Sequence, residues 1–438
     1  MTTMTTMTAK LQCWIESANT PECDFPIQNL PLGIFRRTGS TDEPGVGVAI
    51  GDQVLDVRAC VEAGIVSALT PESACALCAT TLNVFMAQGR TSWEGTRSAL
   101  TALLAADTPT LRDDPALRER CLVPATGAEM MLPATIGDYT DFYASLHHAT
   151  NVGTMFRPDN PLLPNYKHLP VGYHGRSSSI VTDGTPIHRP SGQLRPDDNA
   201  PPIFGPSRLL DYELEMAFFV GPGNAQGERI SMPDALGHIF GMVILNDWSA
   251  RDVQKWEYQP LGPFNAKNFA TSVSPWIVSL DALEPYRVPQ PPRGPDDPPV
   301  LEYLEPAGDA AYDITVEVYL ASQQMRDAGT EPLRMSRGSF TDMYWTIAQM
   351  LVHHASTGCN FRPGDLLASG TVSGPTEESR GSMLERTWRG QNPIELPDGT
   401  TRKFLADGDE VTIRAYCDKP GAPRIGFGEC RGVILPAT

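Results

Sequence analysis

The sequence contains no apolar run long enough to cross a membrane, and it is poor in positive charge. Even the strongly apolar stretch from Phe240 to Leu245 ends at Asn246 and Asp247, far short of the roughly 18 residues that a membrane span needs. Lys and Arg number 34 against 52 Asp and Glu, which gives a formal net charge of −18. Because an acidic surface repels phosphate backbones, we expect neither nucleic acid nor a membrane as a partner.

Several catalytic and binding signatures are also missing. The sequence contains no G-x-x-x-x-G-K-S/T, G-x-S-x-G or H-E-x-x-H motif, which excludes the nucleotide-binding, serine-hydrolase and zinc-protease chemistry of those motifs. The nine cysteines follow no regular spacing, and the N-terminal stretch MTTMTTMTAKLQ lacks the features of a secretion signal. We therefore expect a reduced, cytoplasmic protein. Cys75 and Cys78 have no second pair at zinc-binding spacing, so we expect no structural zinc.

The composition indicates a folded protein rich in strands and loops. Hydrophobic residues make up 41% of the chain and charged residues 20%, which is typical of globular proteins. The 40 prolines and 38 glycines favour strands and turns over a helical bundle. A length of 438 residues allows two or three domains. We expect a mobile N-terminal extension over residues 1–24, a small domain over 25–132 and a large domain over 133–438.

Hydrophobic periodicity predicts the main elements. The run GVGVAIGDQVLDV from Gly45 predicts a hairpin around a Gly-Asp turn, and residues 61–120 show helical spacing. Strands are expected over 211–220, 238–246, 312–321 and 410–417. One helix is expected over 340–356, with Ser339 or Thr341 as its N-cap. The Pro-rich stretches 189–206 and 285–306 are expected to be surface loops.

Three carboxylates follow one another at alternate positions in DYELE. Because strand side chains alternate between faces, Asp211, Glu213 and Glu215 are expected on one side. Like charges this close need solvent, cationic partners or a metal, and a hard cation such as Ca²⁺ or Mg²⁺ takes several carboxylate oxygens. The alternative is a solvated strand face.

Another acidic residue lies at the end of a different apolar strand, where the sequence becomes polar. Asp247 opens the segment NDWSARDVQKWEYQPLGPFNAKNFATS, which also carries Arg251, Gln254, Tyr258 and Lys267. Loops at strand ends commonly carry function. The alternative is a helix start capped by Asp247 or Ser249.

Two further segments contain candidate catalytic residues. If residues 138–160 are helical from Thr140, Asp141 and His148 lie two turns apart on one face, where a metal ligand and a general base can act together. The alternative is that His148 is a structural hydrogen-bonding residue. In residues 362–390 three glycines allow close backbone approach to a ligand, and the alternation of apolar and polar residues can turn Glu385 inward.

Long segments of the sequence resemble the fumarylacetoacetase family. The resemblance rests on DYTDFYASLHHATNVGTMFR, LPVGYHGRSSSIV, RLLDYELEMAFFVGPGN, NDWSARDVQKWEYQPLGPF and CNFRPGDLLASGTVSG, and it extends from DFPIQNLPLGIF to GFGECRGVILPA. It implies a mainly β (α+β) fold, with a small N-terminal SH3-like domain and a large C-terminal domain of the mixed β-sandwich roll type. It also implies a homodimer. The first 23 residues and the Pro-rich stretch 286–306 lie outside the resemblance.

The resemblance also implies the roles of individual residues. It assigns a calcium ion to Asp141, Glu213, Glu215 and Asp247, and a magnesium ion to the surroundings of Asp247, Lys267 and Thr271. It assigns the role of general base to His148, with Glu385 as the carboxylate that orients it, and stabilisation of the oxyanion to Arg251, Gln254 and Lys267. The substrate contacts that it implies are Tyr143, Arg157, Gln254, Tyr258 and Thr371. Asp211 matches no ligand and is expected to be a structural hydrogen-bonding residue.

The activity that the resemblance implies is metal-dependent hydrolysis of the carbon–carbon bond of 4-fumarylacetoacetate. The products are fumarate and acetoacetate, at the last step of tyrosine and phenylalanine degradation. The alternative within the superfamily is a related acylpyruvate or other 3-oxoacid hydrolase or decarboxylase. An alternative of another class is a β-rich binding module whose metal is purely structural.

Overall fold

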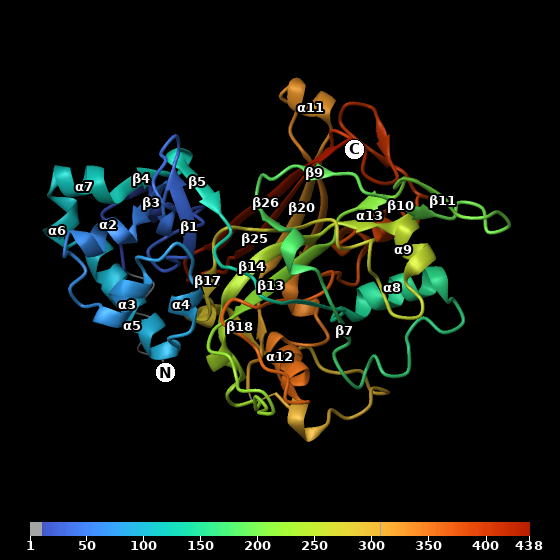
Figure 1. The fold of residues 1–438 in the computed structure, drawn as a ribbon, viewed down its shortest axis with the longest axis horizontal. Coiled ribbons are helices and arrows are strands. Elements are labelled where there is room, and N and C mark those ends of the chain that lie inside the picture. The colour runs from blue at the N-terminus through green and yellow to red at the C-terminus, as the bar shows by residue number, and fades with distance from the viewer. Residues whose placement is uncertain (1–10, 307) are drawn as a thin grey trace.

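The computed structural model describes residues 11–306 and 308–438, which form a mixed α/β structure in two parts. The smaller N-terminal part, blue to cyan in Figure 1, lies beside a larger C-terminal part. The two parts share a buried apolar core, in which Ile34 and Val46 of the first cluster with Phe219, Val243 and Leu245 of the second. This shared core ties the N-terminal part to one face of the sheet that carries the site described below.

The N-terminal part contains the expected hairpin. Strands β2 (Gly45–Ile50) and β3 (Gln53–Asp56) pair antiparallel around Gly51 and Asp52. They belong to a sheet of order β4-β3-β2-β1-β5, completed by β1 (Leu32–Arg37), β4 (Leu122–Pro124) and β5 (Ala128–Met131). Strand β2 is buried along its whole length, because helices cover one side of this sheet.

The helical prediction for residues 61–120 is confirmed. The helices are α2 (Val57–Glu62), α3 (Pro71–Ala76), α4 (Asn83–Met86), α5 (Arg90–Leu104), α6 (Pro109–Arg112) and α7 (Pro115–Cys121). Three of them start with proline, which needs no hydrogen bond to its nitrogen at the first helical position. The longest, α5, buries Leu100, Leu103 and Leu104 against the sheet's core.

The N-terminal extension differs from the expectation where the structure describes it. The expected mobile segment falls partly on residues 1–10, which lie outside the described residues. From Leu11 the chain packs onto α5: Cys13, Ile15 and Ala18 are buried, and the amide of Trp14 donates to the carbonyl of Leu104 at 3.3 Å. The apolar residues of this short segment, which includes η1 (Glu16–Asn19), account for its packing against the domain.

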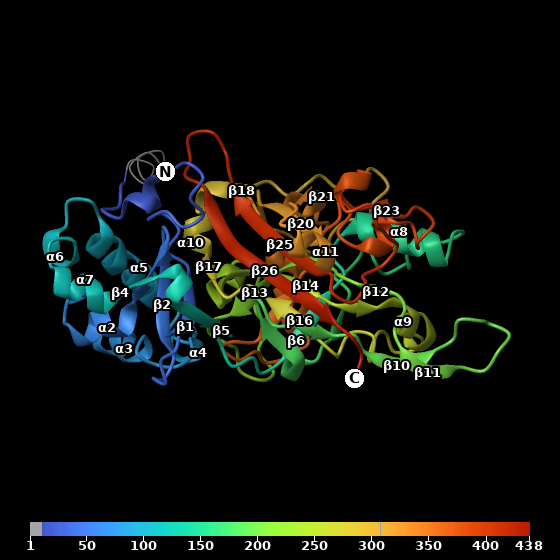
Figure 2. The same cartoon turned by 90° about the horizontal axis from the view of Figure 1, so that it is seen from above.

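Two sheets form the body of the C-terminal part. The first has the order β7-β6-β22-β13-β14-β16-β8, with β17 paired to β14; its strands are β6 (Tyr139–Phe142), β7 (Gly172–His174), β8 (Ile180–Thr182), β13 (Leu214–Val220), β14 (Ile239–Asp247), β16 (Thr271–Val273), β17 (Val278–Ser279) and β22 (Leu366–Ala368). The second has the order β21-β20-β25-β26-β9; its strands are β9 (Ile187–His188), β20 (Thr315–Ala321), β21 (Leu333–Ser339), β25 (Glu410–Cys417) and β26 (Ile425–Leu435). Figure 2 shows β25 and β26 as two long neighbouring strands.

The alternation expected for the DYELE strand is visible in its packing. Tyr212, Leu214, Met216 and Phe218 enter the core that the first sheet shares with β20 and β25 of the second. The next residues along the strand face the opposite way, toward the core shared with the N-terminal part. Period-two alternation thus places an acidic end and an apolar middle on the same face of β13.

The helix expected over 340–356 is shorter than predicted. A 3-10 turn, η7 (Phe340–Asp342), follows Ser339, and the helix α12 (Ile347–Ala355) starts only after Thr346, whose side chain forms a capping box with Gln349. The sequence prediction placed the start too early because Ser339 does accept a hydrogen bond, but from the 3-10 turn.

The remaining elements are short and lie around the two sheets. The helices are α8 (Leu146–Phe156), α9 (Arg251–Glu257), α10 (Leu280–Leu283), α11 (Gln323–Asp327) and α13 (Met383–Arg386); the paired strands are β10 (Ser191–Leu194) with β11 (Ile203–Pro206), β12 (Leu210–Asp211) with β15 (Ser249–Ala250), β18 (Arg287–Val288) with β19 (Ala311–Tyr312), and β23 (Ile394–Glu395) with β24 (Thr401–Arg402). The 3-10 turns not yet named are η2 (Ala125–Gly127), η3 (Ser177–Ser179), η4 (Ala235–His238), η5 (Glu284–Tyr286), η6 (Glu302–Leu304) and η8 (Glu377–Ser379).

The two Pro-rich stretches differ from the expectation. Residues 189–206 were expected to be a loop, but they contain β10 and β11, a ribbon that extends from the body in Figures 1 and 2. Its prolines lie in the tip and at its ends, where no ladder hydrogen bond is lost. The stretch 285–306 was also expected to be a loop, but it contains the end of η5, strand β18 and η6, and only residues 289–301 between them contain no helix or strand.

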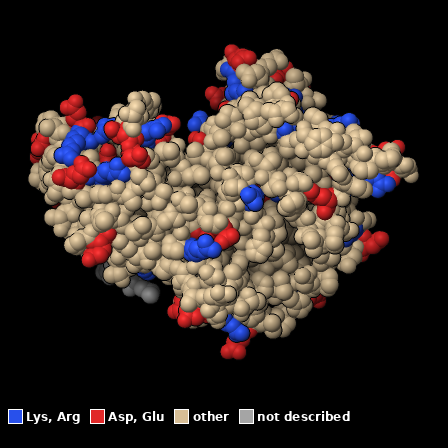
Figure 3. All heavy atoms as spheres, in the orientation of Figure 1, with Lys and Arg blue, Asp and Glu red and all other residues tan. Residues whose placement is uncertain are grey.

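Charged side chains of both signs mingle on the surface. Figure 3 shows Lys and Arg beside Asp and Glu over the N-terminal part, where Arg36 pairs with Glu129 and Arg120 with Glu62. Among the helices of the described residues, none is both long and apolar enough to span a bilayer.

Candidate active site

Four carboxylates meet at one edge of the first C-terminal sheet. Asp141 lies on β6, Glu213 directly before β13, Glu215 as its second residue, and Asp247 at the end of β14. The pairing explains the meeting: Asp141 is in register with the last residue of β22, and Leu214 is in register with Asn246 of β14. One ligand oxygen from each carboxylate lies within 4.8 Å of the others, and all four residues are buried.

The neighbours of this carboxylate cluster neutralise only part of it. Lys267 donates to Glu213 and, at 2.5 Å, to Asp247, while Nη1 of Arg251 lies 2.7 Å from Oε1 of Glu213. Burial alone would raise the pKa of Glu213, but Lys267 and Arg251 outweigh it and hold that pKa below its ordinary value.

The other three carboxylates are short of positive charge. Burial and repulsion from neighbouring carboxylates raise the pKa of Asp141 and Glu215 well above the ordinary range. Burial also raises the pKa of Asp247, although Lys267 opposes it. Ionised carboxylates in this position therefore need an additional cation.

Unpartnered oxygens show that the cluster fits a metal ion. Oδ1 of Asp141 and Oε1 of Glu215 are buried and have no hydrogen-bond partner among residues 11–306 and 308–438. A buried acceptor without a partner costs about 1–3 kcal/mol. An all-oxygen donor set of this kind suits a hard divalent cation such as Ca²⁺ or Mg²⁺. Thr271 adds a hydroxyl that donates to Asp247 at 3.3 Å.

Beside this carboxylate cluster lies a buried histidine–glutamate pair. Nδ1 of His148 is 2.6 Å from Oε2 of Glu385, and both side chains are buried. Because an ionised carboxylate can only accept, Nδ1 carries the proton in this bond. The second ring nitrogen, Nε2, is then free to accept a proton, and it lies 3.9 Å from Oε1 of Glu213.

Three further side chains hold Glu385 in place. Asn151 donates to Oε1 at 2.9 Å, and the hydroxyls of Ser373 and Ser382 donate to Oε2, each at 2.9 Å. Burial would raise the pKa of Glu385, but His148 and these donors hold it below its ordinary value. Glu385 is therefore a preorganised anion at the back of the imidazole ring.

The first residues of the helix expected from Thr140 form a strand instead. Residues Tyr139–Phe142 form β6, which pairs with β22 and β7, and helix α8 begins only at Leu146, where Ser145 accepts from the amide of His148. Asp141 and His148 therefore meet through a strand–turn–helix and not through two turns of one helix. The alternative reading of the next segment, a helix start capped by Asp247 or Ser249, is wrong: α9 begins at Arg251 without a side-chain cap.

A cavity of about 390 Å³ opens in front of these groups. Its walls include these residues predicted from the sequence: Asp141, Tyr143, His148, Arg157, Glu213, Arg251, Gln254, Tyr258, Lys267 and Thr371. Glu215, Asp247 and Glu385 lie behind this wall, in contact with residues that line it. Thr271 does not line the cavity either, and it bonds Asp247. Apolar side chains of Val152, Phe156 and Leu163 complete the cavity.

Sequence profiles of known families match almost the whole chain. The profile described as "Fumarylacetoacetate (FAA) hydrolase C-terminal" matches residues 138–435, which include every residue of the cavity, and "Fumarylacetoacetase N-terminal" matches residues 28–133. The chain belongs to the fumarylacetoacetate hydrolase family.

Relatives of this family cover nearly the full length. A protein of Rattus norvegicus named fumarylacetoacetase is 54% identical over 417 residues, which cover 95% of this chain and 97% of the relative. The fumarylacetoacetase of Homo sapiens is 53% identical with the same coverage, and that of Oryza sativa subsp. japonica is 49% identical over 430 residues, 98% of each chain. The solved structure of a fumarylacetoacetate hydrolase from Exiguobacterium antarcticum shares the fold, with a TM-score of 0.50, 18% identity, and coverage of 93% of this chain and 99% of that one.

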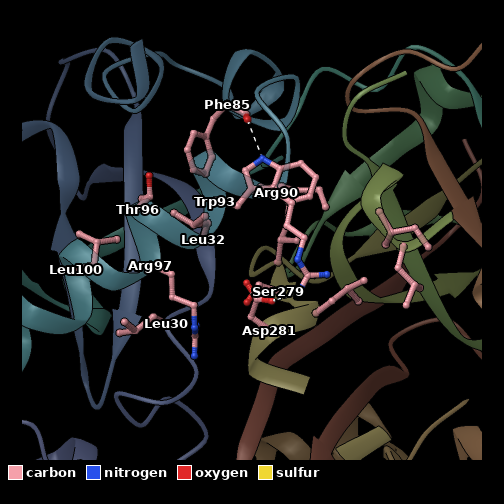
Figure 4. A pocket seen from close by; sticks show the side chains of 15 residues that line it. Leu30, Leu32, Phe85, Arg90, Trp93, Thr96, Arg97, Leu100, Ser279 and Asp281 are labelled. Atoms are coloured by element: carbon pink, nitrogen blue, oxygen red, sulfur yellow. Dashed lines mark hydrogen bonds and ion pairs between the residues drawn. The ribbon is translucent and has the colours of Figure 1, made fainter. Parts of the chain in front are cut away.

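A second, smaller hollow lies between the two parts of this member of the fumarylacetoacetate hydrolase family. Figure 4 shows it between α5 and the C-terminal part, lined by Trp93, Arg97 and Leu100 and closed by the ion pair of Arg90 with Asp281. Its volume is about 40 Å³, and none of the residues predicted for the site lines it. The larger cavity, with its acidic and basic side chains, is the better candidate for a polar substrate.

Sequence reasoning missed Tyr173 in this fumarylacetoacetate hydrolase family member. Its hydroxyl donates to Oδ2 of Asp247 at 3.0 Å, and its side chain lines the cavity. The signal was present in LPVGYHGRSSSIV, a segment of the resemblance from which no residue was chosen. Asn151, Ser373 and Ser382 were missed as well, because nothing in the local sequence connects them with Glu385.

The Pro-rich stretch contacts Lys167, which lies in the chain between two residues of the cavity wall, Leu163 and Val171. Lys167 donates to Asp297, whose carboxylate also accepts from the hydroxyl of Tyr344 at 3.1 Å. The guanidinium of Arg293 lies 4.5 Å from the ring centroid of Tyr344, and it donates to the carbonyl of Lys167 at 2.5 Å. Through these contacts residues 293–297 hold the segment that follows Arg157.

Proposed function

We propose that this family member hydrolyses the carbon–carbon bond of 4-fumarylacetoacetate to give fumarate and acetoacetate, the last step of tyrosine and phenylalanine degradation. The observation that carries the proposal is the common cavity, in which the His148–Glu385 pair faces the four-carboxylate cluster. Relatives named fumarylacetoacetase at about half identity over the full chain support the choice of substrate.

His148 is proposed as the general base. Its Nε2 takes a proton from a water molecule, whose oxygen attacks one carbonyl carbon of the β-diketone. The imidazolium that forms is stabilised by Glu385, whose Oε2 accepts the Nδ1 proton with 2.6 Å between the two heavy atoms. The arrangement is that of a catalytic triad with water in the place of serine.

Arg251, Gln254 and Lys267 are proposed to stabilise the oxyanion. Nη1 of Arg251 donates to Oε1 of Gln254 at 3.1 Å, which leaves the amide nitrogen of Gln254 to donate to a ligand. Nη2 of Arg251 has no partner among the described residues. One donor aimed at a developing oxyanion contributes roughly 3–4 kcal/mol.

Cleavage then transfers the electron pair of the carbon–carbon bond to the leaving acetoacetate, as an enolate, and the proton on His148 returns to that carbon. A divalent cation held by Asp141, Glu213, Glu215 and Asp247 would supply Lewis-acid stabilisation of negative charge on the diketone oxygens. The substrate contacts are proposed to be Tyr143, Arg157, Gln254, Tyr258 and Thr371, all of which line the cavity. Thr371 Oγ1 and Nε of Arg157 are buried without partners among the described residues, so both are available as donors.

Calcium is proposed for the site of four carboxylates, and magnesium for the surroundings of Asp247, Lys267 and Thr271. Carboxylates from three strands give the multiple oxygens that Ca²⁺ prefers. The proposed magnesium site has fewer ligand oxygens than the calcium site. Lys267 already bonds to Asp247, and only Thr271 adds a neutral oxygen.

The first test follows the loss of the diketone absorbance of fumarylacetoacetate on addition of the protein. We expect turnover of fumarylacetoacetate with a kcat/KM about tenfold or more above that for a shorter acylpyruvate, because Arg157 and Tyr258 line a cavity of about 390 Å³ that can hold the longer dicarboxylate. Preferential turnover of the acylpyruvate would replace the proposed substrate, and no turnover of either would indicate a binding module.

Residues 293–297 give a second prediction, on substrate binding. Changing Asp297 to Asn removes the charge that Lys167 and Tyr344 bond, and the wall segment after Arg157 becomes less ordered. We expect KM for fumarylacetoacetate to rise about 3- to 10-fold, the loss of one charge-assisted hydrogen bond, with kcat nearly unchanged. Steady-state kinetics measures both. Asp407→Asn, which breaks the surface pair with Arg189, is the control and should change neither, and a fall in kcat alone would contradict this role for Asp297.

The finer fold assignment and the assembly are also proposed. The antiparallel N-terminal sheet over residues 25–132 is consistent with an SH3-like domain, and the two facing sheets over 133–438 with a mixed β-sandwich roll. We propose a homodimer, for which the exposed apolar side chains of Phe204, Leu261 and Phe264 offer a contact surface. A cytoplasmic location is supported by the nine free cysteines.

A further inference from the structure

Asp211 is the one acidic residue of DYELE that the proposed chemistry does not use. It is completely buried, yet it does not line the cavity and does not belong to the carboxylate cluster. Strand β12 ends at Asp211 and β13 begins at Leu214, so the two are separate elements. The Asp211 carboxylate therefore does not join the ligands at positions 213 and 215.

Four donors satisfy the Asp211 carboxylate. Oδ2 accepts from Nε of Arg251 at 2.8 Å and from the amide of Leu384 at 3.0 Å. Oδ1 accepts from the amides of Met383 and Tyr212, each at 2.8 Å. One side chain thus joins helix α9, through Arg251, to the start of helix α13.

Both partners carry groups of the proposed catalytic machinery. The same guanidinium that donates to Asp211 through Nε donates through Nη1 to Glu213 and Gln254. Helix α13 carries Glu385, the carboxylate that orients His148. Asp211 therefore bonds Arg251 directly, and it bonds the first amides of the helix that carries Glu385.

The contacts require a carboxylate at this position. The first amides of a helix have no partner within the helix; in α13 the amide of Glu385 donates to Ser382, and those of Met383 and Leu384 depend on Asp211 as their acceptor. The guanidinium of Arg251 is buried between two carboxylates and can be shared between them only while both are anions. An asparagine would turn an amide donor toward either Arg251 or the helix amides, so one of these bonds would be lost.

We propose that Asp211 is a positioning residue that sets Arg251 and Glu385 in their working geometry from a single point. The proposal rests on the proposed function, because it assigns Arg251 and Glu385 their roles in the reaction. It acts through those two residues and touches no substrate.

The chain contains a matched control for the charge and the burial. Asp409 is also completely buried, and it bonds Arg402 at 2.8 and 2.9 Å and the amide of Ala406 at 2.8 Å. Neither Asp409 nor Arg402 lines the cavity. Loss of the charge at 211 or at 409 removes a similar buried pair, but only the first pair leads to the site.

The test compares Asp211→Asn with Asp409→Asn in the full-length protein. We expect both to lower the melting temperature, but only Asp211→Asn to reduce kcat for fumarylacetoacetate, on the order of 100-fold, as expected for misplaced catalytic groups, with KM changed less than about threefold. In a Glu385→Gln background the same substitution should cost much less, because both changes then act on one unit. Equal kcat for the two single variants, or losses that multiply with Glu385→Gln, would overturn the proposal.

Amide hydrogen exchange gives a readout independent of turnover. In Asp211→Asn we expect the amides of Met383 and Leu384 to exchange faster, while those of β13 and β14 keep their protection. Unchanged exchange at these two amides would overturn the positioning role even if the protein proved inactive on fumarylacetoacetate. Inactivity of the unchanged protein, with faster exchange in the variant, would count against the proposed function and leave the positioning role standing.

Discussion

Changing His148 to Ala is expected to reduce kcat for fumarylacetoacetate by about 10³- to 10⁴-fold. The substitution removes the only group of the described cavity wall that has both a free ring nitrogen and a buried carboxylate behind it, and losing a general base of this kind costs about that much. Stopped-flow or steady-state measurement of the diketone absorbance, with the cation present, checks the value.

The companion substitution Glu385→Gln should be nearly as damaging. An amide at this position can donate to Nδ1 and so favour the tautomer whose Nε2 already carries a proton. Asn151, Ser373 and Ser382 would still bond the side chain, so the protein should fold. His353→Ala is the control: its ring bonds Tyr303 far from the cavity wall, and turnover should not change. Near-normal turnover of either His148→Ala or Glu385→Gln, with the cation bound, would show that another group is the base.

Removing the divalent cation is the second change with a large expected effect. Treatment with EDTA should lower turnover by on the order of 100-fold or more, because Lewis-acid stabilisation contributes several kcal/mol, and Ca²⁺ or Mg²⁺ added back should restore it. Binding of the cation should also stabilise the fold, by about 2.7 kcal/mol at a concentration 100 times its Kd. Turnover that survives chelation would rule out the metal-dependent reaction.

The stabilisation by the cation should increase with pH. Burial raises the pKa of Asp141, Glu215 and Asp247 in the cation-free protein, so the folded state keeps protons that the unfolded chain releases above about pH 4. Rising pH therefore destabilises the cation-free fold, and the cation removes this penalty by binding the ionised carboxylates. The rise in melting temperature on adding a fixed Ca²⁺ concentration should be larger at pH 8 than at pH 5.

A matched pair of variants separates the metal site from general burial of charge. Glu215→Gln removes a carboxylate oxygen from the cluster and should weaken Ca²⁺ binding by about 10- to 100-fold, as measured by calorimetry. Glu317→Gln changes a buried glutamate of β20 that pairs with Arg334 and Arg337, and it should leave Ca²⁺ binding unchanged. Equal affinities in the two variants would exclude Glu215 as a ligand.

The global charge of −18 remains compatible with an anionic substrate. Polyanions need an extended basic surface, whereas a small dicarboxylate needs only a few cations in a cavity. Arg157, Arg251 and Lys267 line that cavity. With one divalent cation bound, the formal charge becomes −18 + 2 = −16.

Local patterns were sufficient for elements whose partners are close in sequence or whose faces differ in polarity. The hairpin at Gly51 and the buried strand β14 were predicted because period-two alternation and turn residues are local properties. The start of α12 was misplaced because Ser339 or Thr341 was chosen as its N-cap, although Thr346 and Gln349, which form the capping box, mark the start with a local pattern.

The residue types of the site were determined by the sequence, but their grouping was decided by the tertiary structure. Alternation by itself put Asp211, Glu213 and Glu215 on one face, and local patterns made Asp141, His148, Asp247 and Glu385 candidates. The family resemblance joined them, without Asp211, into one site. Only the pairing of β6, β22, β13 and β14 brings these carboxylates within 4.8 Å, because register between distant strands is set by contacts that no local pattern records. The same holds for Asp211, which alternation assigned to the carboxylate cluster and which instead bonds Arg251 and the start of α13, two partners that are distant in sequence.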